Sequence, residues 1–188
     1  RLRNTLRFLL ANTADFDPGA GEGAQMLPPA EWLEVDRYAL ALARQLQAQC
    51  TADYERFEFH KVVQALMNFC SEDLGAFYLD ILKDRLYTAA ENSRARRSAQ
   101  SALWHILQTV TRLMAPVLSF TAEEIWTTIG SKCEQGDSVM LSTWHVLPDQ
   151  GEESALATRW QAIRAVRGDV ARTLEELRSA GKIGSSLQ

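Results

Sequence analysis

The sequence of 188 residues contains few cysteines, and their arrangement signals no known site. Cys50, Cys70 and Cys133 are odd in number and widely separated, and none belongs to a C-x-x-C pair. This pattern argues against a disulfide framework and against a zinc site, and it is typical of the reducing cytoplasm. No apolar run approaches the ~20 residues that a helix needs to cross a bilayer, so we expect no membrane partner.

Catalytic motifs are missing as well. The chain has no G-x-x-x-x-G-K-[ST], no G-x-G-x-x-G, no H-E-x-x-H and no G-x-S-x-G. Its three histidines, His60, His105 and His145, are isolated from one another in the sequence and show no ligand spacing. We therefore expect no catalytic site, no cofactor and no metal in this chain.

An excess of positive charge is also absent. Lys and Arg together number 20 against 24 Asp and Glu, which gives a net charge of −4. A dedicated nucleic-acid-binding domain is usually basic, so any RNA contact has to come from a local cluster of cations, and DNA is not an expected partner.

Helical periodicity recurs along the chain, whereas β-type alternation is almost confined to residues 138–144. The sequence therefore predicts an all-α protein, a helical bundle. Helices are predicted from the N-terminus to about residue 14, over 31–54, and over 57–90 with a bend or break at Gly75 and a split near Ser71. Further helices are predicted from Asn92 or Ser93 to Pro116, from Thr121 as N-cap in capping-box spacing with Glu124 to Gly130, and over 151–180. Residues 131–151 are predicted to be a loop.

The predicted organisation has three parts. Residues 1–150 form the bundle, and residues 151–180 form a long C-terminal helix whose apolar seam predicts packing on that bundle. Residues 181–188 are the start of a linker. Because the chain begins without Met inside an amphipathic helix, we expect it to be a fragment of a longer protein.

Basic residues concentrate in two places. One group, Arg1, Arg3 and Arg7, opens the chain, and Arg3 and Arg7 lie with Asn4 opposite the leucine stripe of the first helix. The second group surrounds the turn before the fourth helical segment and consists of Lys83, Arg85, Arg94, Arg96 and Arg97. Arginine binds phosphate oxygens in pairs and stacks on bases, so the two groups together could form an RNA-binding surface. The pattern alone favours the alternative, an ordinary solvated helix face.

Several segments resemble the bacterial isoleucyl-tRNA synthetases. They include "RLRNTLRFLLAN", "FYLDILKDRLY", "RRSAQSALWHI", "LSFTAEEIW" and the closing "IGSSLQ". The "LSFTAEEIW" segment is shared with the valine, leucine and methionine enzymes of class Ia, whereas "FYLDILKDRLY" and "IGSSL" indicate isoleucine. The resemblance implies an anticodon-binding domain that recognises the anticodon stem-loop of isoleucine tRNA as a monomer. The parent ligase would then attach isoleucine to that tRNA with ATP.

The resemblance also implies where other functions lie. ATP with Mg²⁺ and isoleucine would bind upstream of this chain, and a zinc module would follow it. The residues carried over as RNA contacts are Arg3, Asn4, Arg7, Lys83 and Arg85, with Arg94, Arg96 and Arg97 as phosphate contacts and Asn4 as the reader of a base edge. Two alternatives stay open: a structural spacer between catalytic and C-terminal modules, and the equivalent domain of a valine or leucine enzyme.

Overall fold

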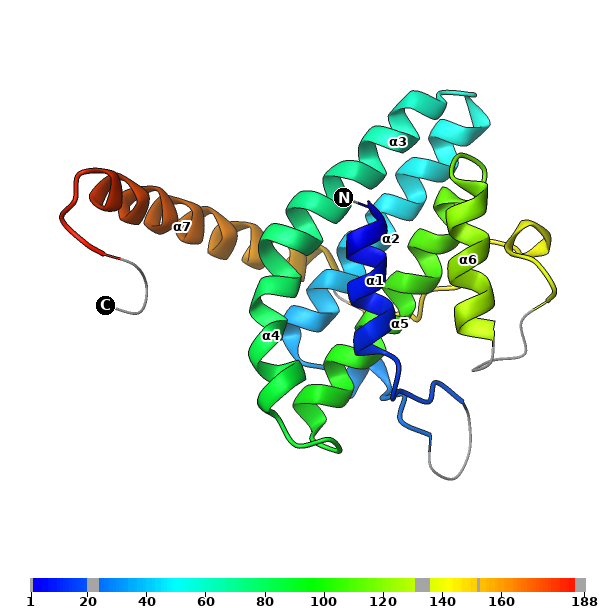
Figure 1. Ribbon diagram of the computed structural model, residues 1–188, viewed down its shortest axis with the longest axis horizontal. Coiled ribbons are helices and arrows are strands. Elements are labelled where there is room, and N and C mark those ends of the chain that lie inside the picture. Colours follow the sequence, from blue (N-terminus) through cyan, green and yellow to red (C-terminus); the bar gives the residue numbers. More distant parts are fainter. Residues whose placement is uncertain (1, 20–23, 131–135, 152, 185–188) are drawn as a thin grey trace. The chain divides into compact units, whose positions relative to one another are not determined.

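A computed structural model describes residues 2–19, 24–130, 136–151 and 153–184. Its helices are α1 (Leu2–Asn12), α2 (Glu34–Glu55), α3 (Phe59–Asn68), α4 (Leu79–Thr88), α5 (Arg94–Met114), α6 (Ser119–Ile129) and α7 (Glu153–Ser179) (Figure 1). A π-helix, η2 (Phe69–Tyr78), joins α3 to α4, and short 3₁₀ turns form η1 (Pro29–Glu31) and η4 (Val139–Leu141). No strand occurs in these described ranges, and the prediction of an all-α fold is confirmed.

The chain divides into two compact units, Arg1–Gln150 and Gly151–Gln188. The second unit contains α7, which corresponds to the long helix predicted over 151–180. The packing of that helix on the bundle and the linker at 181–188 stay predictions. Among the described residues, no helix combines the length and the apolar character needed to cross a membrane.

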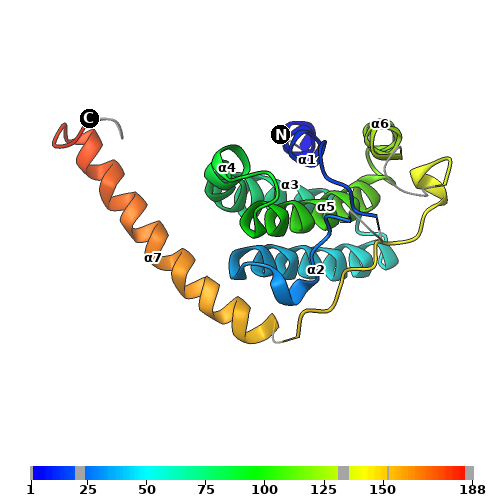
Figure 2. The same cartoon turned by 90° about the horizontal axis from the view of Figure 1, so that it is seen from below.

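The central helix of the first unit is α5. Figure 2 shows α2 on one side of it and α1, α4 and α6 on the other. The apolar positions predicted for this helix are all buried: Leu103, Ile106, Leu107, Val110 and Leu113. Because α5 is covered on several faces, polar side chains are buried too, and two of them anchor the loop before α2. Ser101 Oγ accepts a hydrogen bond from the Leu27 amide at 3.1 Å, and Ser98 Oγ accepts one from the Leu33 amide at 2.7 Å.

The predicted leucine stripe of α1 faces this core. Leu2, Leu6 and Leu9 are buried, and the helix packs against α5, α6 and η2. At the start of α5, Ser93 is the N-cap, and its hydroxyl accepts a hydrogen bond from the Arg96 amide at 3.3 Å. The capping prediction is therefore confirmed for Ser93.

The segment that follows α3 departs from the prediction. No break occurs near Ser71, because the backbone stays helical and widens from α to π geometry at η2. In such a helix the carbonyl of residue i accepts from the amide of residue i+5. A Cβ atom at Gly75 would lie 3.0 Å from the carbonyl oxygen of Cys70, five residues earlier. A larger residue here would therefore press on the backbone, which favours glycine, and the predicted bend is replaced by a continuous, wider helix.

The start of α6 also differs from the prediction. The helix begins at Ser119, its N-cap is Leu118, and no side chain caps it. Thr121 therefore lies inside the first turn and cannot be the N-cap. The predicted capping-box partner, Glu124, instead uses its carboxylate to bind Arg3. The predicted end of the helix at Gly130 is confirmed, since Gly130 is the C-cap.

We call residues 136–150 the α2 strap. Its first part, with η4, packs against α6 and α5, and residues 145–150 run along α2. Side chains of α2 hold it through its backbone carbonyls: Arg37 donates to Gln150 at 2.8 Å, Arg44 to Pro148 at 2.6 Å and Gln47 to His145 at 2.9 Å. The alternating residues 138–144 contain the 3₁₀ turn η4 and no strand. Residues 131–135 of the predicted loop lie outside the described residues.

Candidate nucleic-acid interface

The first group of predicted RNA contacts is exposed on α1. Arg3, Asn4 and Arg7 all face solvent, opposite the buried leucines of the same helix. Asn4 also lines a shallow hollow with Thr5 and part of η2. We call these three side chains the α1 polar face. Arg1, which precedes them, lies outside the described residues.

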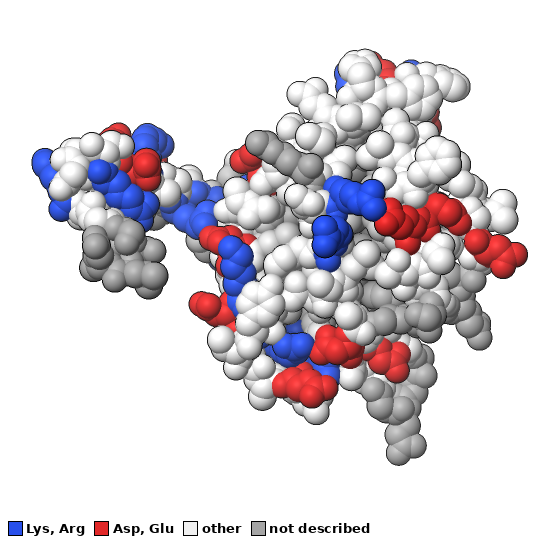
Figure 3. All heavy atoms as spheres, viewed as in Figure 1, with Lys and Arg blue, Asp and Glu red and all other residues white. Residues whose placement is uncertain are grey.

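The two arginines of the α1 polar face differ in their contacts. One guanidinium nitrogen of Arg3 donates to both carboxylate oxygens of Glu124, at 2.7 and 2.8 Å. Both side chains are largely exposed, at 63% and 58%. Arg7 forms no side-chain hydrogen bond or ion pair with any described residue. Figure 3 shows basic side chains over α1 directly beside acidic ones over α6.

The second group lies around the turn between α4 and α5, and only two of its members are exposed. Lys83 pairs with Asp80 one turn earlier, at 3.0 Å. Arg94 donates from Nε to the carbonyl oxygen of Glu31 at 2.6 Å. The other three, Arg85, Arg96 and Arg97, turn inward and bind residues of the protein itself.

Arg85 belongs to a buried polar cluster centred on Asp36. Its guanidinium donates to both carboxylate oxygens of Asp36, at 2.6 and 3.0 Å. Asp36 is fully buried, and it also accepts hydrogen bonds from the hydroxyls of Tyr78 and Ser98. Burial lowers the pKa of the Arg85 guanidinium, but its bonds to Asp36 outweigh this and raise the pKa above its ordinary value. The cluster joins α2, η2, α4 and α5, so Arg85 is placed to stabilise the bundle.

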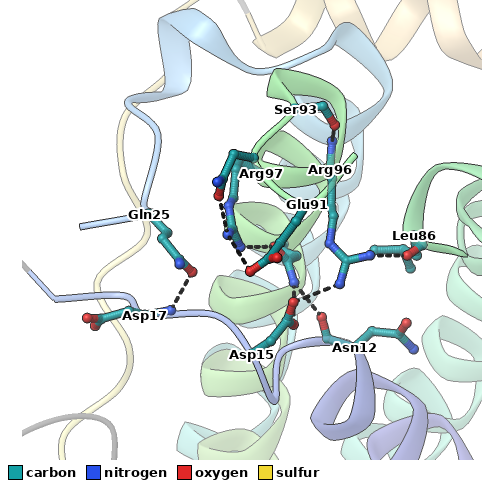
Figure 4. A network of polar contacts seen from close by, with 11 residues as sticks. Asn12, Asp15, Asp17, Gln25, Leu86, Glu91, Ser93, Arg96 and Arg97 are labelled. Atoms are coloured by element: carbon teal, nitrogen blue, oxygen red, sulfur yellow. Dashed lines mark hydrogen bonds and ion pairs between the residues drawn. The ribbon is translucent and has the colours of Figure 1, made fainter. Parts of the chain in front are cut away.

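Arg96 and Arg97 form a second internal network, which Figure 4 shows at the N-terminal end of α5. Arg96 donates to Asp15 Oδ2 at 2.7 Å and to the carbonyl oxygen of Leu86. Burial raises the pKa of Asp15, but the hydrogen bond from Arg96 and further bonds outweigh it and hold the pKa below its ordinary value. Arg96 therefore ties the end of α4 to the loop that follows α1.

Arg97 is more enclosed than Arg96, with only 5% of its side chain exposed. It donates to Gln100 Oε1 at 2.7 Å and to Asn92 Oδ1 at 2.9 Å. Gln100 in turn donates to Asp15 Oδ1 at 2.8 Å and to the Asn12 carbonyl oxygen at 3.0 Å. Arg97 is thus part of the connection between α5 and the end of α1.

The two basic groups do not form one continuous basic surface. In Figure 3 the basic side chains over α1 and those near the α4–α5 turn lie on one face of the molecule, and they are separated by uncharged side chains. Of the eight residues predicted to bind RNA, the exposed ones are Arg3, Asn4, Arg7, Lys83 and Arg94. The RNA contacts of all eight stay predictions, but the contacts of Arg85, Arg96 and Arg97 already have a structural explanation.

Two histidines that looked isolated in the sequence meet in the structure. His105 Nδ1 on α5 lies 2.8 Å from His145 Nε2 on the α2 strap. Burial lowers the pKa of His105 to about 4 and that of His145 to about 3. Both rings are therefore neutral at pH 7, and one donates a hydrogen bond to the other. No local signal could have revealed this pair, because the two residues are 40 positions apart.

No other arrangement in the described part of the chain has the character of a reactive site. Burial raises the pKa of the Cys50 thiol to about 11 and that of the Cys70 thiol to about 12, so neither forms a thiolate readily. The described residues also contain no group of three His, Cys, Asp or Glu side chains that could hold a metal ion.

The chain is similar to known proteins over its whole length. Residues 36–188 match the family described as the anticodon-binding domain of tRNA ligase. The whole chain is similar to isoleucine–tRNA ligases from Aromatoleum aromaticum (63% identity, 19% of that protein), Azoarcus sp. strain BH72 (61%, 20%) and Dechloromonas aromatica (60%, 20%). The chain thus spans about a fifth of the length of these curated relatives. Since the family match extends over most of its residues, the chain belongs to the anticodon-binding domains of tRNA ligases.

Proposed function

We propose that this chain is the anticodon-binding domain of an isoleucine–tRNA ligase and that it binds the anticodon stem-loop of isoleucine tRNA. The observation that carries the proposal is the similarity of all 188 residues to ligases of that name, at 60% to 63% identity. These relatives favour isoleucine over valine or leucine as the amino acid of the parent enzyme. The parent enzyme would use ATP to join isoleucine to the tRNA that this domain holds.

The exposed polar residues are the ones best placed for RNA. Arg7 is free to bind a phosphate, and Asn4 presents an amide donor and acceptor beside it on the same helix. Lys83 and Arg94 would extend the contact along the α4–α5 turn as phosphate ligands. Arg85, Arg96 and Arg97 would support this surface from within, because each holds together the elements that carry it.

The remaining features of the proposal concern the longer protein. ATP with Mg²⁺ would bind before this domain and zinc after it, in regions that this chain does not contain. We also propose that the domain acts as a monomer in the cytoplasm. These assignments follow from the resemblance to the ligases.

A direct test is binding of the chain to the isolated anticodon stem-loop of isoleucine tRNA, with the valine stem-loop as competitor. We expect the isoleucine stem-loop to bind about tenfold more tightly, since one lost base-edge contact costs about 1–3 kcal/mol. Asn4→Ala should reduce this preference without changing the salt dependence, because it removes a hydrogen-bonding pattern and no charge. The matched control is Asn68→Ala, an exposed asparagine on α3.

A structural spacer is the second candidate function. The net charge of −4 favours it, as does the internal use of three of the seven predicted cationic RNA contacts. A spacer would bind the isoleucine and valine stem-loops equally weakly. Equal binding in the competition experiment would therefore contradict the proposal and support the spacer.

A further inference from the structure

A groove lies between α1 and α6, next to the α1 polar face. Its volume is about 290 Å³. The floor is apolar and includes Leu10, which is half-buried, and Ile125, which is buried. The polar residues of its rims are Arg3 and Arg7 on α1 and Thr121, Glu124 and Thr128 on α6. An apolar floor with a few polar groups around it is the usual lining of a ligand site.

The two rims carry opposite charges. Arg3 and Arg7 occupy successive turns of α1, so both guanidinium groups border the same groove. Glu124 on α6 binds Arg3 with both carboxylate oxygens, at 2.7 and 2.8 Å, whereas Arg7 is bound by no described residue. One arginine is therefore already occupied, and the other is open to an anion.

The bond between Arg3 and Glu124 is easily exchanged. Both side chains are mostly exposed, and such ion pairs are weak and further weakened by salt. A phosphate offers an arginine the same two-oxygen geometry as a carboxylate. A phosphate that reaches Arg7 therefore competes with Glu124 for Arg3, and the charge of Glu124 opposes its approach.

We propose that the groove between α1 and α6 holds one unpaired ribonucleotide of the bound RNA, and that Glu124 weakens this site by holding Arg3. The inference rests on the proposed function, since it assigns a position to part of the RNA. The base lies on Leu10 and Ile125, and the phosphate is bound by Arg7 and by Arg3 after its release from Glu124. The hydroxyl of Thr121, which bonds to no described residue, meets the ribose 2′-hydroxyl.

The first test frees Arg3. In Glu124→Gln, we expect the isoleucine anticodon stem-loop to bind about threefold more tightly, with a log K against log salt slope steeper by about one ion. Glu55→Gln makes the same charge change at an exposed position on α2, outside the groove, and should leave the slope unaltered. Urea unfolding of both variants confirms that the fold is intact. A weaker complex with Glu124→Gln would overturn the proposal.

The second test examines the ribose contact. Thr121→Val keeps the shape of the side chain and removes its hydroxyl, and we expect about a threefold loss of affinity for the RNA stem-loop. The same variant should bind a stem-loop with 2′-deoxy loop nucleotides as well as the unaltered chain does. An equal loss on both stem-loops would contradict the ribose contact and overturn the assignment of the groove.

These measurements separate the groove from the proposed function. If the stem-loop binds with the expected preference but Glu124→Gln and Arg7→Ala change neither affinity nor salt slope, the groove assignment is wrong and the proposed function stands. If the unaltered chain shows no preference for the isoleucine stem-loop, the proposed function itself fails.

Discussion

The two basic regions of this chain look alike in sequence but bury their cations to very different degrees. On α1, Arg3 and Arg7 remain at the surface, and the only side-chain bond that either makes to a described residue is the exposed pair of Arg3 with Glu124. At the α4–α5 turn, Arg85 and Arg97 are enclosed, with 19% and 5% of their side chains exposed. An arginine-rich stretch can therefore bind RNA or stabilise the fold. The acidic and carbonyl groups near each arginine determine which of the two roles it has.

The largest expected loss of stability among substitutions of these cations is at Arg85. Arg85→Ala leaves the carboxylate of Asp36 buried without its cation, and such a loss costs about 3–5 kcal/mol of unfolding free energy. Lys83→Ala, two residues away on the same helix, removes only an exposed pair and should cost less than about 1 kcal/mol. Urea unfolding measures both. Equal losses would mean that burial does not distinguish the two cations.

A smaller loss of stability is expected at Arg97. Arg97→Ala removes the donors that satisfy Gln100 and Asn92, and we expect a cost of about 2 kcal/mol. Arg94→Ala is the matched control, because Arg94 is exposed and makes a single bond to a backbone carbonyl. If Arg97→Ala instead leaves stability intact and weakens RNA binding, Arg97 belongs with the surface cations.

The α1 polar face should show the opposite behaviour. The double variant Arg3→Ala and Arg7→Ala is expected to lower affinity for the stem-loop about tenfold and to flatten the salt slope by about one to two ions. Its unfolding free energy should fall by less than about 1 kcal/mol, since the ion pair it loses is exposed. Arg56→Ala, an exposed arginine at the end of α2, serves as the control for RNA binding. An unaltered salt slope together with a clear loss of stability would reverse the roles of the two regions.

The smallest expected effect concerns pH. The folded-state pKa of Asp15 lies below its unfolded value, so the stability that Asp15 contributes is present above the unfolded pKa and is lost as pH falls through the folded one. Arg96→Ala removes the main bond that lowers this pKa, and it should therefore lose less stability than the unaltered chain on acidification from pH about 5 to about 2. Urea unfolding at both pH values measures the two losses, which should differ only slightly because Asp15 is partly exposed. Identical losses in the two proteins would contradict the coupling.

Much of the fold could be predicted because helical periodicity is local. The buried leucines of α1 and the apolar positions of α5 follow from spacing alone. Two local features were misread. Thr121 and Glu124 have capping-box spacing, yet the helix starts at Ser119 and Glu124 binds Arg3. The bond of Glu124 depends on Arg3 of α1, which lies far away in the sequence.

The sequence could not predict which basic side chains are buried against acidic partners. Lys83 and Arg85 are neighbours on one helix, but only Arg85 faces Asp36, which is 49 positions earlier. Arg96 meets Asp15 across 81 positions. The sequence around these arginines does not indicate their acceptors, because the packing of other helices brings the acceptors next to them. The exposed candidates, in contrast, follow from the polar side of an amphipathic helix.

The π-helix η2 has a consequence for insertions and deletions. Each residue added to or removed from a helix rotates everything after it by about 100° about the helix axis. The wider turns between Phe69 and Tyr78 therefore set the rotational phase of α4 relative to α3. Arg85 faces Asp36 at this phase, so the buried ion pair between α4 and α2 depends on the widened helix between Phe69 and Tyr78.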